Sequence, residues 1–157
     1  MTRKRTNRRE KSEYDQKLLE LARVTRVVKG GRRFRFRAVV IAGNRNGKVG
    51  VGIAKGADVS EAVRKGFNDA KKHMVQIKRY NSTIACEAQA KSGSARVMLK
   101  PAKPGRGIVA GGSVRAVVEI AGIRDIVSKS QGSANKLSVA RATVKALEQV
   151  KILSGRQ

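Results

Sequence analysis

Basic and apolar residues alternate along one short stretch, and this alternation constrains the fold more than any other feature of the chain. Residues 33–38 read Arg-Phe-Arg-Phe-Arg-Ala. Because successive side chains of a β-strand point to opposite faces, the pattern predicts a strand with the arginines on one face. On the other face, Phe34, Phe36 and Ala38 are expected to enter a core. Burial of unpaired cations is very costly, so the arginine face must lie in water or contact an anion.

The charge balance indicates that this anion is a nucleic acid. Residues 21–57 contain ten Lys or Arg residues and no Asp or Glu, and the 157-residue chain has a formal net charge of +25. Such a charge repels itself in a compact protein, and nucleic acid supplies the densest counter-charge. Aromatic residues make up only 3% of the chain. That disfavours stacking on many unpaired bases and favours structured nucleic acid held by its backbone.

Residues 29–33, which read Lys-Gly-Gly-Arg-Arg, form the best candidate contact loop. Two glycines let the backbone come close to a partner, and their N–H groups can bind phosphate between the flanking cations. A surface that is merely solvated normally mixes both signs of charge, whereas acids are absent here. The sequence therefore predicts phosphate contacts at this loop and along the basic strand faces.

The first half of the chain predicts three antiparallel strands followed by a helix. A charged tail, residues 1–14, is expected to be disordered until it binds. Residues 16–28 are ambiguous between helix and strand, and β-branched residues favour a strand over the second half. A turn at Gly30-Gly31 leads to strands at 34–42 and 48–54, joined by a hairpin turn at 44–47.

Two further features of this half concern the helix. Gly50 and Gly52 leave one side of the third strand nearly bare, which permits the close approach of another backbone. Asp58-Val-Ser-Glu61 has the form of a capping box and opens a helix. The apolar residues that follow recur at helical spacing and are expected to face the sheet; they are Ala62, Val63, Gly66, Phe67, Ala70 and Met74.

The second half predicts another α+β unit. Strands are expected at 84–90 and 95–100 around Ser92-Gly93, and an irregular loop at 101–107. A helix at 113–121 stops at Gly122, a strand follows at 123–128, and a last helix covers 135–150. The expected domains are residues 15–79 and 80–152, with a short tail at 153–157. Each is near the lower size limit for independent stability, so the two are expected to pack together.

Residues 105–110 and Asp125 match the spacing of a dinucleotide-binding fingerprint, but their context argues against that function. A strand should run directly into the first glycine, and Pro101 and Pro104 interrupt it. The glycines are better explained by a tight connection. Free N–H groups at the start of the helix at Ser113, beside Arg106, could also hold a phosphate or a neighbouring protein.

No catalytic, metal or cofactor site is expected. His73 is the only histidine and is interpreted as structural, because zinc would need more His or Cys ligands. Cys86 is the only cysteine, is expected to be buried in a strand, and fits a reducing cytosol. The eleven acids are scattered, and no apolar run approaches the length of a membrane-spanning helix.

Two ordered sets of motifs give the chain a specific resemblance. Residues 28–36 read Val-Lys-Gly-Gly-Arg-Arg-Phe-Arg-Phe, and residues 43–50 read Gly-Asn-Arg-Asn-Gly-Lys-Val-Gly. In the second half, residues 105–112 read Gly-Arg-Gly-Ile-Val-Ala-Gly-Gly, and 121–125 read Ala-Gly-Ile-Arg-Asp. From about Glu13 to Val150 the chain resembles the bacterial-type family of small-subunit ribosomal protein five. Departures occur at 82–86 and 135–138, where the family often has Gly-Thr-Ile-Pro-His and Asn-Pro-x-Asn.

The resemblance implies an α+β fold and a place in the small ribosomal subunit of the cytoplasm. The N-terminal β-β-β-α unit would be similar to a double-stranded-RNA-binding domain and would pack on a C-terminal unit with a left-handed β-α-β crossover, against the usual handedness. The family binds small-subunit ribosomal RNA, contacts ribosomal proteins four and eight, supports decoding accuracy and lines the channel through which mRNA enters.

The resemblance and the charge pattern together give the expected contact residues. Those expected to bind ribosomal RNA are Arg26, Lys29, Gly30, Gly31, Arg32, Arg33, Arg35, Arg37, Asn44, Arg45, Lys48 and Lys55. Those expected to contact a neighbouring protein are Arg106, Gly111 and Arg115. Two alternatives are a free double-stranded-RNA-binding regulator or RNA chaperone, and a nucleotide-using enzyme built on the loop at Gly105.

Overall fold

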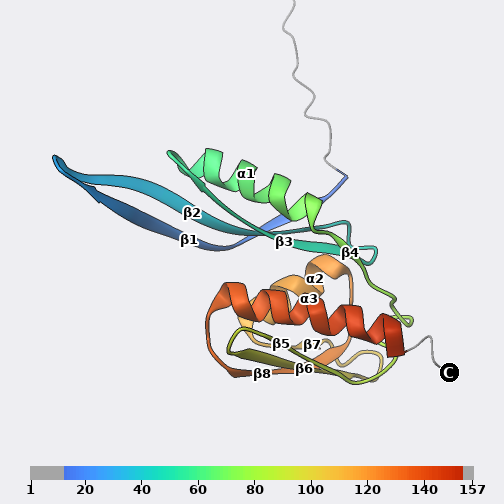
Figure 1. The fold of residues 1–157 in the computed structure, drawn as a ribbon. Helices are drawn as coiled ribbons and strands as arrows, with labels where there is room; N and C mark the ends of the chain where they lie inside the picture. Colours follow the sequence, from blue (N-terminus) through green and yellow to red (C-terminus); the bar gives the residue numbers. More distant parts are fainter. Residues whose placement is uncertain (1–12, 154–157) are drawn as a thin grey trace, which may run out of the picture.

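Helices and sheets stack in four layers in the computed structural model, which describes residues 13–153 and the side chains up to residue 150 (Figure 1). Most of the tails expected at 1–14 and 153–157 lies outside the described residues. In chain order the elements are β1 (Asp15–Val28), β2 (Gly31–Gly43), β3 (Lys48–Gly56), α1 (Val59–Lys72), β4 (Val75–Gln76), β5 (Ala88–Ser92), β6 (Ala95–Pro101), β7 (Ile108–Val109), α2 (Gly112–Ala121), β8 (Ile126–Gly132) and α3 (Lys136–Leu153). Helix α1 covers the first sheet, and α2 and α3 lie between the two sheets.

The first sheet has the strand order β1-β2-β3-β4, and its first three strands are antiparallel as predicted. The ambiguous segment 16–28 is strand over its whole length, because β1 pairs with β2 from Asp15 opposite Gly43 to Val28 opposite Gly31. The register shifts between Leu18 and Glu20. The short β4 was not predicted, since two residues carry no readable periodicity.

Helix α1 packs on the face of the first sheet that carries the small residues of β3. A Cβ atom added at Gly50 would lie 2.3 Å from the carbonyl oxygen of Ala70, and one added at Gly52 would lie 2.2 Å from that of Gly66. The close backbone approach predicted at these glycines is therefore confirmed. Ala62, Gly66 and Ala70 are the buried residues of the helix, in agreement with the predicted apolar face.

The N-terminus of α1 is capped as the sequence predicts. Asp58 is the N-cap and accepts a hydrogen bond from the backbone N–H of Ser60, while Glu61 accepts one from the N–H of Ala57 at 2.8 Å. The pKa of Asp58 is lowered, chiefly by the hydroxyl of Ser60. The pKa of Glu61 is lowered by Lys65 first and then by the Ala57 N–H.

The opposite face of the first sheet changes character along its length. Near the base of β2, Val39 and Ile41 are fully buried in the main core with Val49 and Val51 of β3. This core continues into α2, α3 and the second sheet, so the two halves of the chain share it. Toward the β1–β2 turn the same face carries Arg37, Arg35 and Arg33 in place of apolar residues.

The prediction that Phe34 enters a core is wrong. Phe36 is half-buried beside α1 and Ala38 is fully buried, but the Phe34 side chain is 48% exposed. The β1–β2 hairpin extends beyond the end of α1 (Figure 1), and Phe34 lies outside the small core that Phe36 and Ala38 form with the helix. The ring instead packs under the guanidinium of Arg23, 4.6 Å from its centre.

The second sheet has the order β5-β6-β8-β7. Strand β7 pairs in parallel with β8, and α2 connects the two strands in the chain. This β-α-β unit confirms the predicted α+β class, whereas its left-handed crossover stays a prediction. Strand β5 begins at Ala88 rather than 84, and Cys86 lies half-buried in a bend, so its predicted place in a strand is wrong. Strand β8 begins at Ile126 rather than 123, because the N–H of Ile123 still bonds to the carbonyl of Val118 in the cap of α2.

Candidate nucleic-acid interface

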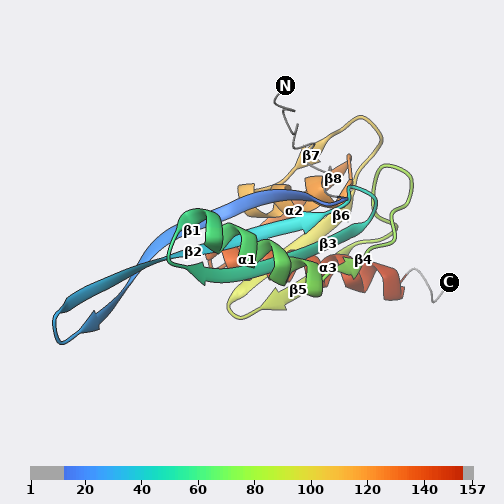
Figure 2. The ribbon, with the colours of Figure 1, turned by 90° about the horizontal axis from the view of Figure 1, so that it is seen from above.

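The outer part of the β1–β2 hairpin, residues 24–35, projects from the body of the molecule and is called the arm here (Figures 1 and 2). Its two strands meet in a two-residue turn at Lys29-Gly30, since Val28 pairs with Gly31. Val27 near the tip is 77% exposed. The arm is therefore held by its ladder and by its base rather than by a core of its own.

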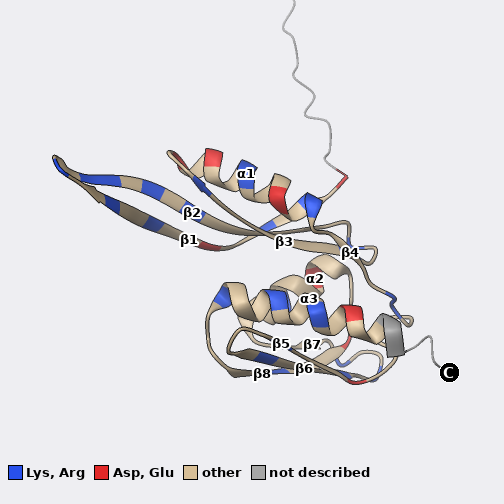
Figure 3. Cartoon of the chain, viewed as in Figure 1, with Lys and Arg blue, Asp and Glu red and all other residues tan. Residues whose placement is uncertain are grey.

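One face of the arm gathers like charges at short range. Arg26 lies directly opposite Arg33 across the ladder, and Arg35 follows on the same face. These residues and Lys55 line a hollow of about 500 Å³ with Val24, Thr25 and Val28. Among the described residues, none of the cations Arg26, Arg33, Arg35 and Lys55 forms an ion pair. Figure 3 shows the resulting run of basic residues along β1 and β2.

Such an arrangement has a cost in the free protein. Like charges directly opposite each other on a sheet destabilise the strand pair. No described acid pairs with the cations of the arm to offset the repulsion, and the arm is too exposed for packing to do so. Binding of an anion to this face would remove the repulsion.

The tip of the arm is open to a partner. A Cβ atom added at Gly30 or Gly31 would meet nothing within 4 Å, and Gly31 has φ +137°, a conformation that side chains rarely adopt. Lys29 and Arg32, on either side of these glycines, are exposed. The predicted contact loop therefore presents bare backbone between free cations.

Arg37 differs from the other predicted arginines. Its Nη2 atom lies 3.2 Å from the Glu20 carboxylate, and its Nε atom is buried with no hydrogen-bond partner among the described residues. The side chain is half-buried at the base of the arm, opposite Lys55. Arg37 thus marks the boundary between the basic arm and the core, and Glu20 offsets its charge.

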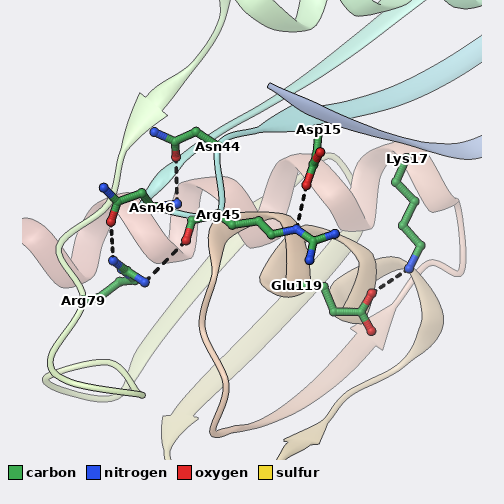
Figure 4. A network of polar contacts seen from close by, with 7 residues as sticks. All are labelled: Asp15, Lys17, Asn44, Arg45, Asn46, Arg79 and Glu119. Atoms are coloured by element: carbon green, nitrogen blue, oxygen red, sulfur yellow. Dashed lines mark hydrogen bonds and ion pairs between the residues drawn. The ribbon is translucent and has the colours of Figure 1, made fainter. Parts of the chain in front are cut away.

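The second predicted contact loop, residues 44–47, does not lie with the arm. It sits at the other end of β2 and packs against the C-terminal end of α2 (Figure 4). The N–H of Arg45 donates to the carbonyl of Ile120 at 3.0 Å, and that of Gly47 donates to Ala121 at 3.1 Å. Carbonyls at a helix end lack partners within the helix, so this turn satisfies them.

Side chains reinforce this junction between the two halves. The Asn44 carboxamide accepts hydrogen bonds from the N–H groups of Asn46 and Lys48, which shapes the turn. Arg45 has φ +53° and pairs with Asp15 at 2.7 Å. Lys17 pairs with Glu119 of α2 at 2.6 Å (Figure 4). Asn44 and Arg45 are therefore occupied in intramolecular contacts, and only Lys48 of this predicted group is exposed without an ion pair among the described residues.

Arg79 completes the junction, and sequence reasoning missed it. Its Nη1 atom donates to the carbonyl of Gly122 at 3.1 Å. Figure 4 shows its contacts with the Asn46 carboxamide, to which Nη2 donates at 2.5 Å, and with the Arg45 carbonyl at 3.5 Å. It lies in the linker between the two halves, where it looked like one more surface cation. A signal was present in Gly122, whose place at a helix end predicts open carbonyls that need a donor.

The predicted protein-contact residues belong to the segment that runs from the loop before β7 to the first turn of α2. Arg106 is exposed, and Gly111 is the N-cap of α2 without a side-chain hydrogen bond. Arg115 donates to the carbonyl of Ile108 at 3.0 Å, so it supports β7. Their role in a protein contact stays a prediction.

Asp125 shapes this loop rather than binding a ribose. Its side chain accepts the Gly107 N–H at 2.8 Å and is only 5% exposed. Hydrogen bonds from the Ser82 side chain first, and then from the Gly107 N–H, lower the pKa of this carboxyl. The acid of the apparent dinucleotide fingerprint thus anchors the loop.

His73, the histidine interpreted as structural, is exposed, and its Nδ1 atom lies 3.0 Å from the carbonyl oxygen of Asp69.

Within the part of the chain that the structure describes, no helix is long and apolar enough to cross a membrane, and no group of three or more His, Cys, Asp or Glu side chains is arranged to hold a metal ion.

Comparison with known proteins covers both halves. The model of the ribosomal protein S5 N-terminal domain matches residues 14–78, and that of the ribosomal protein S5 C-terminal domain matches residues 90–154. A small ribosomal subunit protein uS5 from Campylobacter jejuni (strain RM1221) is 51% identical over 141 residues, which cover 90% of this chain and 96% of the relative. That of Thermotoga neapolitana is 49% identical over 138 residues, covering 88% and 78%.

Proposed function

Since this chain belongs to the ribosomal protein S5 family, we propose that it binds the RNA of the small ribosomal subunit mainly through the arm, residues 24–35. Family membership makes the chain a non-enzymatic structural protein of the small ribosomal subunit that takes part in translation. Its partners there are ribosomal RNA and other ribosomal proteins. The finer assignment of partners to surfaces is the proposal.

The cross-strand pair of Arg26 and Arg33 is the observation that carries the proposal. Two guanidinium groups held opposite each other repel in the free protein, and a phosphate between them converts that repulsion into attraction. Arg35 and Lys55 extend the same positive face, and the exposed tip at 29–32 adds two cations and the open glycine backbone. The arm would therefore neutralise several phosphates of folded RNA at once.

The segment that leads into α2 supports a role in protein contacts. Arg106 is exposed, and an added Cβ atom at Gly111 or Gly112 would meet nothing within 4 Å. An exposed arginine and uncovered backbone suit an interface with another protein. We assign this segment to a neighbouring ribosomal protein, with protein four as the first candidate and protein eight as the second. The segment is separate from the arm, so both surfaces can act together. We extend the proposal to the channel through which mRNA enters and to decoding accuracy, as the family resemblance implies.

The RNA contact can be tested by the salt dependence of binding. In the arm variant, Arg32→Ala, Arg33→Ala and Arg35→Ala are combined, and affinity for small-subunit ribosomal RNA is measured over a series of KCl concentrations. Each lost phosphate contact should reduce the log–log slope by up to about 0.9, because fewer counterions are released.

A matched control removes the same charge from another surface. The α3 control variant combines Lys136→Ala, Arg141→Ala and Lys145→Ala, three exposed positions of the last helix. It should keep the slope of the unmodified protein. An arm variant whose slope equals that of this control would exclude the arm from the RNA contact.

A further inference from the structure

The second sheet has one covered face and one bare face. Helices α2 and α3 pack against the face that carries Ala88, Val97 and Leu99, all of which are buried. On the outward face, polar and basic side chains surround Met98 in the rows nearest the Ser92-Gly93 turn, and no described element covers them. In Figure 1 this sheet is the lowest layer, with the helices on its upper side only. The outer basic face is defined here by Lys91, Arg96 and Lys129 together with Gln89, Met98 and Gln131.

The strand register arranges these side chains in two rows. One row runs from Lys91 through Arg96 to Gln131, and the next runs from Gln89 through Met98 to Lys129. Five of the six residues are exposed, and Met98 is half-buried. All of them except Lys129 line a shallow hollow of about 240 Å³, together with Ala90 and Val97. Figure 3 shows basic residues crossing the strands of this sheet.

The pair of Lys91 and Arg96 repeats the signature of the arm. The two cations are direct cross-strand partners, as Arg26 and Arg33 are. Nothing on this face offsets their repulsion among the described residues, because the nearby Glu87 pairs with Lys100 at 3.3 Å. A like-charge pair on a bare sheet face weakens the pairing of β5 with β6, so its presence indicates an anionic partner.

The composition of the face favours RNA over an acidic protein. The core of a protein–protein interface is depleted in charged residues and enriched in aromatic and other large apolar side chains. The outer basic face has no aromatic residue, and its one large apolar side chain, Met98, is half-buried. Interfaces with nucleic acid are more polar and much more positive. Gln89 and Gln131 beside the cations can donate hydrogen bonds to phosphate or ribose oxygens.

We propose that the outer basic face of the second sheet is a second RNA-backbone contact, separate from the arm and on the C-terminal half of the chain. Three cations and two amides would hold the phosphates of an RNA strand laid across β5, β6 and β8. The C-terminal half would then bind RNA on its sheet and protein at the loop before α2. The protein would connect two RNA segments from opposite sides of its core.

The test compares three variants of the full-length protein in binding to small-subunit ribosomal RNA over a series of KCl concentrations. In the face variant, Lys91→Gln, Arg96→Gln and Lys129→Gln are combined. Its log–log slope should fall by up to about 2.7 for three lost contacts, at about 0.9 for each. The α3 control variant, which removes the same charge, should keep the slope. Combining the face and arm variants should lower the slope by the sum of the two separate changes.

Folding is monitored by urea unfolding of the free protein. The face variant should unfold at an equal or higher urea concentration, because it loses the repulsion between Lys91 and Arg96 and no buried contact. A second variant, Lys91→Arg with Lys129→Arg, keeps the charge and should keep the slope.

An unchanged slope in the face variant would overturn the proposal that the outer basic face binds RNA. The arm variant tests the proposed RNA contact of the arm independently. The proposal would also be overturned if the face variant bound RNA normally but failed to bind another ribosomal protein, since the face would then belong to a protein partner. A fall in slope that the α3 control variant shares would mean that only total charge matters, which would likewise overturn it.

Discussion

The turns at the two ends of β2 look alike in sequence and behave differently in the structure. Residues 29–31 at one end and 44–47 at the other both combine glycine with basic residues, and both were expected to bind RNA. The first turn is bare, with open space around Gly30 and Gly31. The second turn donates its N–H groups to the end of α2, and its arginine pairs with Asp15.

The difference shows what makes a basic turn available to an external partner. Composition sets the charge and the backbone freedom, but only the arrangement of the other elements decides whether an internal partner takes the hydrogen bonds. At 44–47 a helix end with open carbonyls lies within reach, whereas beyond α1 no helix or strand of the described residues packs on the arm. The docked turn should therefore be sensitive to mutation in its effect on stability, and the bare turn in its effect on RNA binding.

The largest expected effect comes from Gly122→Ala, at the end of α2 that the docked turn contacts. A Cβ atom there would lie 1.9 Å from the carbonyl oxygen of Arg45, and Gly122 has φ +82°. The clash with backbone and the left-handed conformation together should lower the free energy of unfolding by roughly 3 kcal/mol or more. Urea unfolding of the purified protein measures this change.

Gly30→Ala is the matched control at the bare turn. An added Cβ atom has nothing within 4 Å, so the free energy of unfolding should change by less than about 0.5 kcal/mol. If the two substitutions had similar effects on stability, the contrast between a docked and a bare turn would not hold.

Arg79→Ala should have a smaller effect on the same junction. It removes the hydrogen bonds to the Gly122 carbonyl and to the Asn46 carboxamide, both at an exposed site. The expected loss in the free energy of unfolding is about 1 kcal/mol. The neighbouring exposed residue provides a control, because Lys78→Ala removes a charge without breaking the junction. Equal urea midpoints for the two variants would show that Arg79 contributes no more than its charge.

The sequence predicted those parts of the fold that depend on local periodicity. The alternation at 33–38 identified β2 and its two faces, and the spacing from Val114 to Ala121 identified α2 to within one residue. The burial of Phe34 was predicted wrongly because it depends on how far α1 reaches along the sheet, which no local pattern encodes. In the same way, β8 begins after Ile123 because the cap of α2 uses that residue's N–H.

The candidate site likewise has features that local sequence patterns predict and features that depend on the three-dimensional arrangement. The positive face of the arm follows from the two-residue period of a strand and was visible in the sequence. The docking of Arg45 against Ile120 joins residues that are far apart in the chain, so it required the three-dimensional arrangement. The pair of Lys91 and Arg96 is an intermediate case. The hairpin around Ser92-Gly93 was predicted, but the bare face it lies on emerged only with the positions of α2 and α3.

A third glycine turn, residues 105–107, combines features of the bare turn and the docked turn. Substitution of its anchor is expected to have the smallest effect on stability. Its glycines have open space around them, as in the bare turn, but the Gly107 N–H is bound by Asp125, as in a docked one. Because the pKa of Asp125 is lowered in the folded protein, the carboxylate stabilises the fold above its ordinary pKa. That contribution is lost as the pH falls below about 4 and through the lowered value.

Asp125→Asn should therefore lower the urea midpoint at neutral pH and reduce the dependence of stability on pH below about 4. Some acid dependence should remain, because hydrogen bonds also lower the pKa of Asp58 and Glu61 at the start of α1. Asp58→Asn separates the two sources: Asn is as good an N-cap as Asp, so this variant should keep the midpoint at neutral pH and lose only part of the acid dependence. If Asp125→Asn instead left the acid dependence intact, the 105–107 loop would be held by its own backbone, and it would belong with the bare turn.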